Sequence, residues 1–207
     1  MDHDDFAVEP IPGLPGHLPK GETILWQGRP ATLPLARQAL ALDWVIGYFA
    51  LLSGLRVAAS AGAMGLTGAL PLAVPFLGLG AVVAGLLVLI AWVQARATVY
   101  TITTERVAMR IGAALTLTLN LPFPKIERAD LDLRRDGTGT ISMTTSGPAK
   151  LSYLVLWPHV RPWRMSRTAP SLRAIPDAER VAAILSDAAY TRVHQPVLAR
   201  SAALAAE

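Results

Sequence analysis

The sequence predicts an α+β membrane protein, in which a transmembrane helical hairpin precedes a cytoplasmic antiparallel sheet domain closed by a C-terminal helix. The first observation is a stretch from Val57 to Ala95 without Asp, Glu, Lys, Arg or His. About 20 apolar residues are enough to cross a bilayer, so this stretch is too long and too apolar for a soluble core segment. After Arg96 apolar and polar residues alternate as in half-buried strands, and after Asp177 apolar residues return at helical spacing.

The composition of the 207 residues excludes several classes of protein. Charged residues make up 16% and hydrophobic residues 52% of the chain, whereas soluble domains contain about 25% charged residues. The net charge of +4 does not indicate nucleic-acid binding, because basic residues beside a membrane span are expected from the orientation rule. The absence of cysteine excludes disulfides, thiolate metal sites and a cysteine nucleophile.

We expect four regions along the chain. Residues 1–38 form a cytoplasmic N-terminal segment that contains a short strand near residues 22–27. Residues 39–95 form the membrane part, residues 96–192 the sheet domain with its closing helix, and residues 193–207 a C-terminal tail. The chain opens with an acidic segment followed by a stretch rich in Pro and Gly, which is not the pattern of a secretory signal peptide.

The membrane part is too long for one helix and is predicted to form two, near residues 39–59 and 70–93. A series of glycines that ends at Pro71 marks the break between them. Pro75 lies in the first turns of the second helix and can kink it. The first helix is short and contains Arg56, so a count of three helices stays open.

Three residues of the membrane part are candidates for contacts inside the bilayer. Gly80 and Ala84 belong to a set of small residues at four-residue spacing, which permits the close approach of another helix, although Gly and Ala are also common in membrane helices without a special role. Arg56 either extends its side chain to the membrane surface or contacts a partner subunit or a lipid head group. Asp43 alone does not supply the set of groups that an intramembrane enzyme needs.

The distribution of positive charge predicts that both chain ends are cytoplasmic. Basic residues lie before the first helix and after the second, while the connecting loop has no Lys or Arg, as expected for a multi-pass membrane protein with this orientation. Trp44 and Trp92 would then lie at the same cytoplasmic interface, as part of an aromatic belt. The basic residues are Lys20, Arg29, Arg37, Arg96, Arg106 and Arg110.

Four runs of alternating residues predict the strands of the sheet domain. The runs are Leu115–Leu121, Leu131–Leu133, Ile141–Met143 and Leu151–Trp157, and turn-forming Gly, Pro and Asp residues separate them. Short strands at this spacing favour an antiparallel sandwich or a small barrel. Pro176–Asp177 then starts a helix whose apolar face can close the sheet. This face is formed by Val181, Ile184, Leu185 and Ala188.

Two motifs resemble the bacterial pleckstrin-homology family. The segment Tyr100–Val107, with the sequence YTITTERV, is similar to the Y-x-[IL]-T-x-x-R turn that follows the membrane helices in that family. The segment Gly21–Pro30 resembles the G-E-x-[IVL]-L-W-x-G-x-P strand of the same family. The resemblance implies a pleckstrin-like sandwich, with a polar turn at Thr103–Arg106 and a second strand at Val107–Ile111. The earlier motif would lie along the membrane face or add to the sheet.

A longer resemblance covers nearly the whole chain. The segments Leu14–Glu22, Leu156–Trp163 and Leu172–Asp177 are similar to segments of the PuhB family of purple bacteria, whose implied role is assembly of the photosynthetic reaction centre and its light-harvesting core antenna. The sequence WPHVRPW, within the second segment, is the most specific of these matches. The resemblance implies that the partners are reaction-centre or core-antenna subunits, or other assembly factors.

The sequence contains no recognisable constellation of catalytic residues, and we expect a protein that is not an enzyme and carries no metal or cofactor. The histidines, at positions 3, 17, 159 and 194, lack metal-ligand spacing. No P-loop or dinucleotide-binding fingerprint occurs in the sequence. Asp130 and Asp132 lie on one strand face beside arginines, where a solvated face is favoured over a catalytic carboxylate pair.

The candidate binding surface is a basic segment interleaved with tryptophans. Three interpretations stay open, namely binding of anionic lipid of the cytoplasmic leaflet, binding of a partner protein, and an edge strand whose charges prevent sheet-to-sheet pairing. Pigment ligation by His159 is disfavoured, because this residue falls in the predicted cytoplasmic domain. The candidate residues are Trp157, His159, Arg161, Trp163, Arg164, Arg167 and Arg173.

These observations favour a non-enzymatic assembly factor of the inner membrane. In this hypothesis the membrane helices lie beside a nascent photosynthetic complex, and the pleckstrin-like domain holds a subunit or another assembly factor. The alternative is a membrane-anchored lipid- or peptide-binding module unrelated to photosynthesis. Three questions stay open: which subunit is bound, whether the chain forms a homo-oligomer, and whether it remains in the mature complex.

Overall fold

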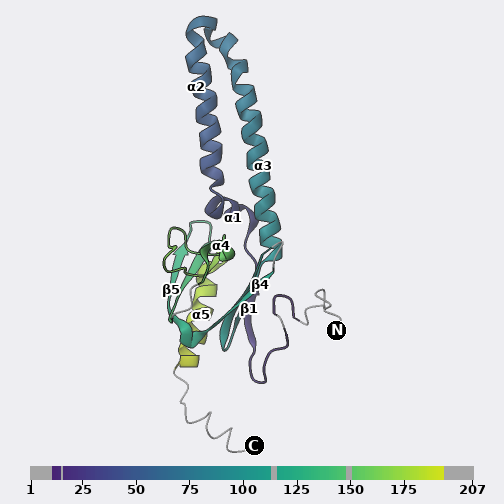
Figure 1. Ribbon diagram of the computed structural model, residues 1–207, viewed down its shortest axis with the longest axis vertical. Coiled ribbons are helices and arrows are strands. Elements are labelled where there is room, and N and C mark those ends of the chain that lie inside the picture. Colours follow the sequence, from purple (N-terminus) through teal and green to yellow (C-terminus); the bar gives the residue numbers. More distant parts are fainter. Residues whose placement is uncertain (1–10, 15, 113–115, 148–150, 194–207) are drawn as a thin grey trace, which may run out of the picture. The chain divides into compact units, whose positions relative to one another are not determined.

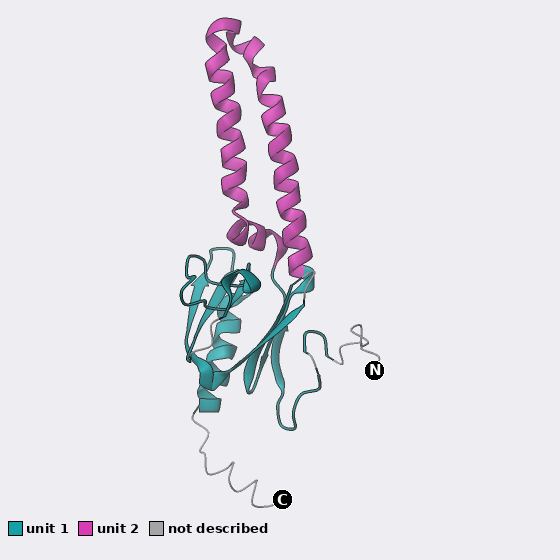
Figure 2. Cartoon of the chain, viewed as in Figure 1, with its two compact units in different colours: residues 1–30, 96–207 teal, residues 31–95 magenta. Residues whose placement is uncertain are grey.

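The computed structural model describes residues 11–14, 16–112, 116–147 and 151–193. The chain divides into two compact units, one formed by residues 1–30 with 96–207 and the other by residues 31–95 (Figure 2). We call them the sheet unit and the helical unit. The predicted C-terminal tail lies outside the described residues beyond Val193.

The helical unit consists of two long helices and two short ones. α2 and α3 lie side by side (Figure 1). Their contact is close at Gly80, where an added Cβ would be 2.7 Å from the Cβ of Phe49. The close approach that the small residues predict is therefore made to a helix of the same chain. The helices are α1 Thr32–Ala39, α2 Leu42–Ala69, the 3₁₀ helix η1 Leu70–Ala73 and α3 Val74–Ala97.

The bounds of the long helices differ from the predicted ones. α2 runs past residue 59 to a kink at Gly65, with a short helical stretch from there to Ala69, and Arg56 lies inside α2 instead of near its end. A single glycine weakens a helix by only about 1 kcal/mol and does not have to end it. The chain leaves helical geometry at Gly65, whose φ of 72° suits glycine. Pro75 is the second residue of α3, where its missing N–H removes no helical hydrogen bond.

Among the described residues, one helical stretch is long and apolar enough to cross a membrane by its length and composition. It runs from Leu42 to Ala97, through α2, η1 and α3. Only 11% of its most apolar window is buried. The core helix of a soluble protein would be mostly buried, so the low burial favours an apolar environment outside the chain.

The sheet unit contains two antiparallel sheets. The first has the strand order β1-β2-β3-β4 and the second has the order β5-β6-β7. Within the described residues the two sheets are separate and do not close into one barrel. The strands are β1 Ile24–Gly28, β2 Val99–Thr103, β3 Arg106–Ile111, β4 Leu117–Pro122, β5 Ile126–Leu133, β6 Gly139–Thr145 and β7 Ser171–Ile175.

The strands agree with most of the alternating runs. β2, the turn after Thr103 and β3 confirm the strand–turn–strand expected from the family resemblance. β4 begins at Leu117, and Leu115 of the first predicted run lies outside the described residues. β7 lies where the sequence predicts no strand, because all five of its residues are buried and show no alternation.

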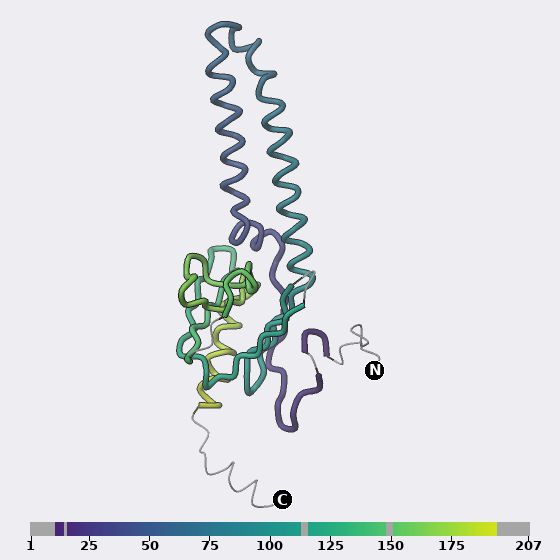
Figure 3. Tube along the Cα trace, in the orientation of Figure 1, coloured from purple at the N-terminus to yellow at the C-terminus, as the bar shows by residue number. Residues whose placement is uncertain are grey.

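β1 belongs to the first sheet although the whole helical unit separates it from β2 in the sequence (Figure 3). The strands pair antiparallel, with Gln27 opposite Thr101 and Gly28 opposite Tyr100. The N-terminal motif therefore adds to the sheet, which is one of its two expected placements. The structure groups the chain up to Pro30 with the sheets rather than as a separate N-terminal segment.

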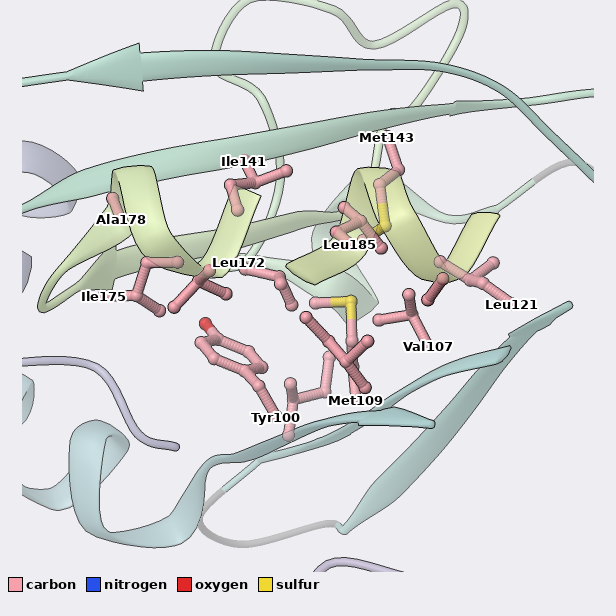
Figure 4. Packing of buried hydrophobic residues seen from close by; sticks show 14 of the residues in the cluster. Tyr100, Val107, Met109, Leu121, Ile141, Met143, Leu172, Ile175, Ala178 and Leu185 are labelled. Carbon is pink, nitrogen blue, oxygen red and sulfur yellow. The ribbon is translucent and has the colours of Figure 1, made fainter. Parts of the chain in front are cut away.

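The core of the sheet unit lies between the two sheets and the closing helix α5, Ala178–Val193. Tyr100 and Met109 from the first sheet face Leu172 from the second, and Leu185 of α5 completes the layer (Figure 4). Burying one such side chain contributes about 1.5–3 kcal/mol. The predicted apolar face of α5 is confirmed, because Val181, Leu185 and Ala188 are buried.

The predicted strand at Leu151–Trp157 is wrong. Tyr153–Leu156 forms the single-turn helix α4, and Leu154 and Val155 are 84% and 61% exposed. A half-buried strand would turn every second side chain toward the core, whereas here two neighbours project into solvent. Pro158 also lacks the N–H that a sheet ladder would need.

Candidate functional site

The segment Tyr153–Arg167, which we call the docking loop, carries a mixed apolar and basic surface. Trp163 is 90% exposed, and Arg164 and Arg167 beside it are also exposed. Trp163 has a φ of 63°, which is rare for a bulky residue and holds its side chain in a strained turn. Four further large apolar side chains of the loop are exposed, namely Leu154, Val155, Trp157 and Met165. Such a group marks a binding surface, because soluble surfaces usually carry large apolar residues singly.

His159 attaches the docking loop to both sheets. It is fully buried. Its Nδ1 lies 2.6 Å from the hydroxyl of Tyr100 in β2, and its Nε2 lies 3.1 Å from Oγ1 of Thr98. The His159 carbonyl accepts a hydrogen bond of 2.9 Å from the N–H of Ser171 in β7. The buried imidazole therefore holds the middle of the docking loop against both sheets.

Burial decides the protonation state of this cluster. It lowers the pKa of His159 to about 3, and the positive charge of Arg173 acts in the same direction. A neutral imidazole has one donor and one acceptor nitrogen. Tyr100 accepts a hydrogen bond of 3.2 Å from the Arg173 N–H, so the arrangement in which Tyr100 donates to Nδ1 and Nε2–H donates to Thr98 satisfies every group. Burial also raises the pKa of Tyr100.

Two of the predicted surface residues do not reach the surface. His159 is 0% exposed and Arg173 is 6% exposed, because both complete the packing beneath the docking loop. The Arg173 Nη1 donates to the carbonyl of Pro158 at 3.2 Å, and burial lowers the pKa of its guanidinium. Both ring nitrogens of His159 are engaged, which leaves neither for a pigment.

Asp130 of β5 anchors the docking loop from the other side. Its carboxylate accepts hydrogen bonds from Arg128 and, at 2.9 Å, from Nη1 of Arg161 in the loop. The hydrogen bond from Arg128 and then that from Arg161 hold the pKa of Asp130 below its usual range. An ion-paired carboxylate fits the solvated strand face better than a catalytic pair with Asp132. Among the described residues no group of three His, Asp or Glu side chains is arranged to hold a metal ion.

A second polar cluster joins the two motifs that resemble one family. Glu22 is 8% exposed and receives two hydrogen bonds from Arg106, from Nε at 2.9 Å and from Nη2 at 3.1 Å. Thr103 Oγ1 lies 2.7 Å from the Glu22 Oε1 and accepts the Arg106 N–H at 3.0 Å. The pairing of Glu22 with Arg106 was not predicted from the sequence. No local signal selects this pair, because each motif contains both an acidic and a basic residue.

A groove of about 430 Å³ lies between β5 and α5. Its walls include Phe123, Leu131 and Leu185, and the exposed side chains of Tyr190 and Val193 border it. Within the described residues β5 pairs with β6 alone, so its outer edge offers backbone groups to an added strand. The groove has no sequence signal, because its lining comes from separate segments of the chain.

The three intramembrane candidates divide into two groups. Gly80 packs on Phe49, and Ala84 borders a small cluster that contains Leu42 and Ala91. Arg56 is exposed on α2. The small residues are therefore used within the chain, and Arg56 stays the candidate for contact with another molecule.

Two comparisons relate the chain to known proteins. The family model described as "Bacterial PH domain" matches residues 46–189. A protein of Rhodobacter capsulatus, described as "Uncharacterized 23.7 kDa protein in puhA 5'region", is 47% identical over 198 residues, which cover 95% of this chain and 92% of that protein. No solved structure matches the chain.

Proposed function

This chain belongs to the bacterial PH domain family, and we propose that it is a non-enzymatic assembly factor of the bacterial inner membrane. In this proposal it promotes assembly of the photosynthetic reaction centre with its core antenna. The membrane helices and the PH-like domain each hold part of the nascent complex. Binding a partially assembled state lowers its free energy, so mass action raises its population.

The similarity to the Rhodobacter capsulatus protein is the observation that carries this proposal. That protein lies in the puhA 5' region, and its 47% identity extends over 95% of this chain. The resemblance of Leu156–Trp163 and Leu172–Asp177 to the PuhB family supports the same role. These two segments meet in the structure, where Arg173 donates to the Pro158 carbonyl at 3.2 Å.

The anchor in this proposal is a transmembrane hairpin of α2 and α3, with both chain ends in the cytoplasm. α2 runs from Leu42 to its kink at Gly65 and α3 has 24 residues, and about 20 suffice for one crossing. The non-helical backbone at Gly65 lies between the two crossings and supports two passes. Basic residues on the outer sides of the two helices support the orientation.

Arg56 is the group that would contact a partner inside the bilayer. A charged residue within a membrane helix is costly and commonly serves a specific contact. We expect an Arg56→Leu variant to insert normally but to lose co-purification with reaction-centre subunits. The neighbouring Leu55→Ala, which also changes an exposed side chain, should keep it. If Arg56→Leu retains all its complexes, Arg56 makes no contact with a partner and its side chain extends to the membrane surface.

Deletion of the gene tests the proposal directly. We expect lower absorbance of the reaction centre and core antenna in isolated membranes, restored by the wild-type chain. Transcripts of the complex subunits should be unchanged, while pulse labelling should show faster loss of the newly made subunits. Normal pigment complexes in the deletion strain would rule out the assembly role.

The groove between β5 and α5 favours a second candidate function, a membrane-anchored peptide-binding module unrelated to photosynthesis. Ala189 lines the groove, and Ala189→Trp would fill it, whereas Ala183→Trp changes an exposed position of the same helix. If the groove serves assembly, only Ala189→Trp lowers the pigment complexes of a complemented deletion strain. If deletion itself leaves those complexes intact, the second function replaces the first.

A further inference from the structure

The docking loop combines exposed apolar side chains with unneutralised positive charge. Trp163 and Leu154 are 90% and 84% exposed. Arg164 and Arg167 flank the exposed Met165, and neither forms an ion pair with an acidic residue in the part of the chain that the structure describes. Aromatic side chains with arginines are the residues that partition into the head-group region of a bilayer.

The sequence around the docking loop contains positively charged residues and no negatively charged ones. The 40 residues from Gly137 to Pro176 contain no Asp or Glu. The acidic group that does reach the loop, Asp130, belongs to β5 and is bound to Arg161 and Arg128. Arg164 and Arg167 therefore present their charge outward, which is complementary to an anionic surface.

The docking loop is bound, through His159, next to the residue at which the chain passes from α3 into the sheet unit. His159 lies 3.1 Å from Oγ1 of Thr98, and Thr98 directly follows Ala97, the last residue of α3. A surface tethered this close to a membrane anchor meets the bilayer at high effective concentration, so weak individual contacts suffice for binding.

We propose that the docking loop binds the surface of an anionic bilayer, with Trp163 and Leu154 in the head-group region and Arg164 and Arg167 on lipid phosphates. This inference rests on the membrane anchoring in the proposed function and deepens it, because it gives the PH-like unit a lipid ligand.

The test uses the full chain in vesicles and exploits its lack of cysteine. A single Met165→Cys carries an environment-sensitive fluorophore, and both tryptophans of the loop stay in place. The protein is reconstituted in vesicles of phosphatidylcholine, with or without the anionic lipid phosphatidylglycerol. An Asp187→Cys probe on the exposed face of α5 provides the reference for a site outside the loop.

We expect the probe at position 165 to report an apolar, lipid-quenched environment only in the anionic vesicles, while the probe at position 187 stays in water. Replacing both Arg164 and Arg167 by Gln should lower the ratio of docked to undocked loop about 25-fold, or about fivefold for each arginine. The matched pair Lys125→Gln and Arg180→Gln removes the same charge at other exposed positions and should leave docking unchanged.

Two outcomes would overturn the inference alone. One is a probe at position 165 that stays in water although the chain is inserted in the membrane, as resistance to carbonate extraction would show. If the probe is then shielded only when a protein complex is added, the loop binds a protein partner. The other is an equal loss of docking in the matched charge pair. Failure of the chain to insert at all would instead overturn the membrane anchoring in the proposed function.

Discussion

Glu22 and Arg106 lie 84 positions apart and form a two-point ion pair, with Arg106 Nε and Nη2 at 2.9 Å and 3.1 Å from the two carboxylate oxygens. The Glu22 side chain is 3% exposed and that of Arg106 is 28% exposed. The pair joins the segment before β1 to the first residue of β3. It therefore closes the sheet unit around the insertion of the helical unit.

Replacing Arg106 by Gln should destabilise the sheet unit by about 2–3 kcal/mol, because Glu22 keeps a buried charge without its partner. Glu22→Gln combined with Arg106→Gln should recover part of this loss. Urea unfolding of the full chain in detergent, followed by circular dichroism, measures both. Asp130→Asn breaks exposed ion pairs and should change the midpoint much less. Equal losses of stability in Arg106→Gln and Asp130→Asn would show that the pair of Glu22 and Arg106 is no stronger than an exposed ion pair.

The buried His159 should make stability depend on pH. Its pKa is about 3 in the folded chain against 6.5 for an ordinary histidine, so the unfolded chain binds the additional proton between these values. Stability is therefore fully present above pH 6.5 and falls as the pH is lowered, by up to about 1.4 kcal/mol per pH unit. Unfolding midpoints between pH 7 and about 5, where carboxylates are still ionised, isolate this effect.

A His159→Gln variant should lose that slope, in addition to a lower stability at pH 7. His17→Gln, at an exposed position, should keep it. A wild-type slope in His159→Gln would show that another group causes the pH dependence.

Gly80 and Gly78 should respond in opposite directions to the same change. A Cβ at Gly80 would lie 2.7 Å from the Cβ of Phe49, whereas one at Gly78 meets nothing within 4 Å. Gly80→Ala should therefore destabilise the pair of helices by about 1–3 kcal/mol through overpacking. Gly78→Ala should be neutral or stabilise by up to about 1 kcal/mol. Thermal unfolding in detergent micelles distinguishes them.

Gly139 is expected to tolerate no side chain. An added Cβ would lie 2.6 Å from the Cβ of Ala178 and 2.8 Å from the carbonyl oxygen of Asp132, so neither neighbour can move aside as a flexible side chain would. Gly139→Ala should cost about 1–3 kcal/mol by separating α5 from β6. Gly16→Ala, with nothing within 4 Å, should be close to neutral. Similar unfolding midpoints for both variants would refute the close contact.

Local sequence patterns predicted the elements in which buried and exposed positions recur at a regular spacing. The strands on either side of Thr103, the apolar face of α5 and the long apolar stretch each carry their own periodicity or composition. β7 and α4 were not predictable in this way, because β7 is buried on all sides and α4 is a single turn. The helical break at Gly65 was predicted only as an interval, since helix ends depend weakly on any one residue.

The candidate site was predicted in part. Trp163, Arg164 and Arg167 are exposed as a binding surface requires, and whether they bind lipid or protein stays a prediction. His159 and Arg173 belong to the same segment but are buried, because hydrogen bonds to Tyr100 and Pro158 draw them beneath the loop. The sequence does not distinguish the two groups, since each contains arginine and an aromatic or imidazole ring within one basic segment.

The amino-acid sequence by itself determined that this chain has a long uncharged apolar part and a domain of short strands with a closing helix. Those features follow from local spacing and need no partner far along the chain. The tertiary structure alone decided that β1 pairs with β2 across the inserted helices, that Glu22 meets Arg106, and that β5 and α5 enclose a groove. Each of these depends on contacts between distant segments, which exist only after the chain has folded.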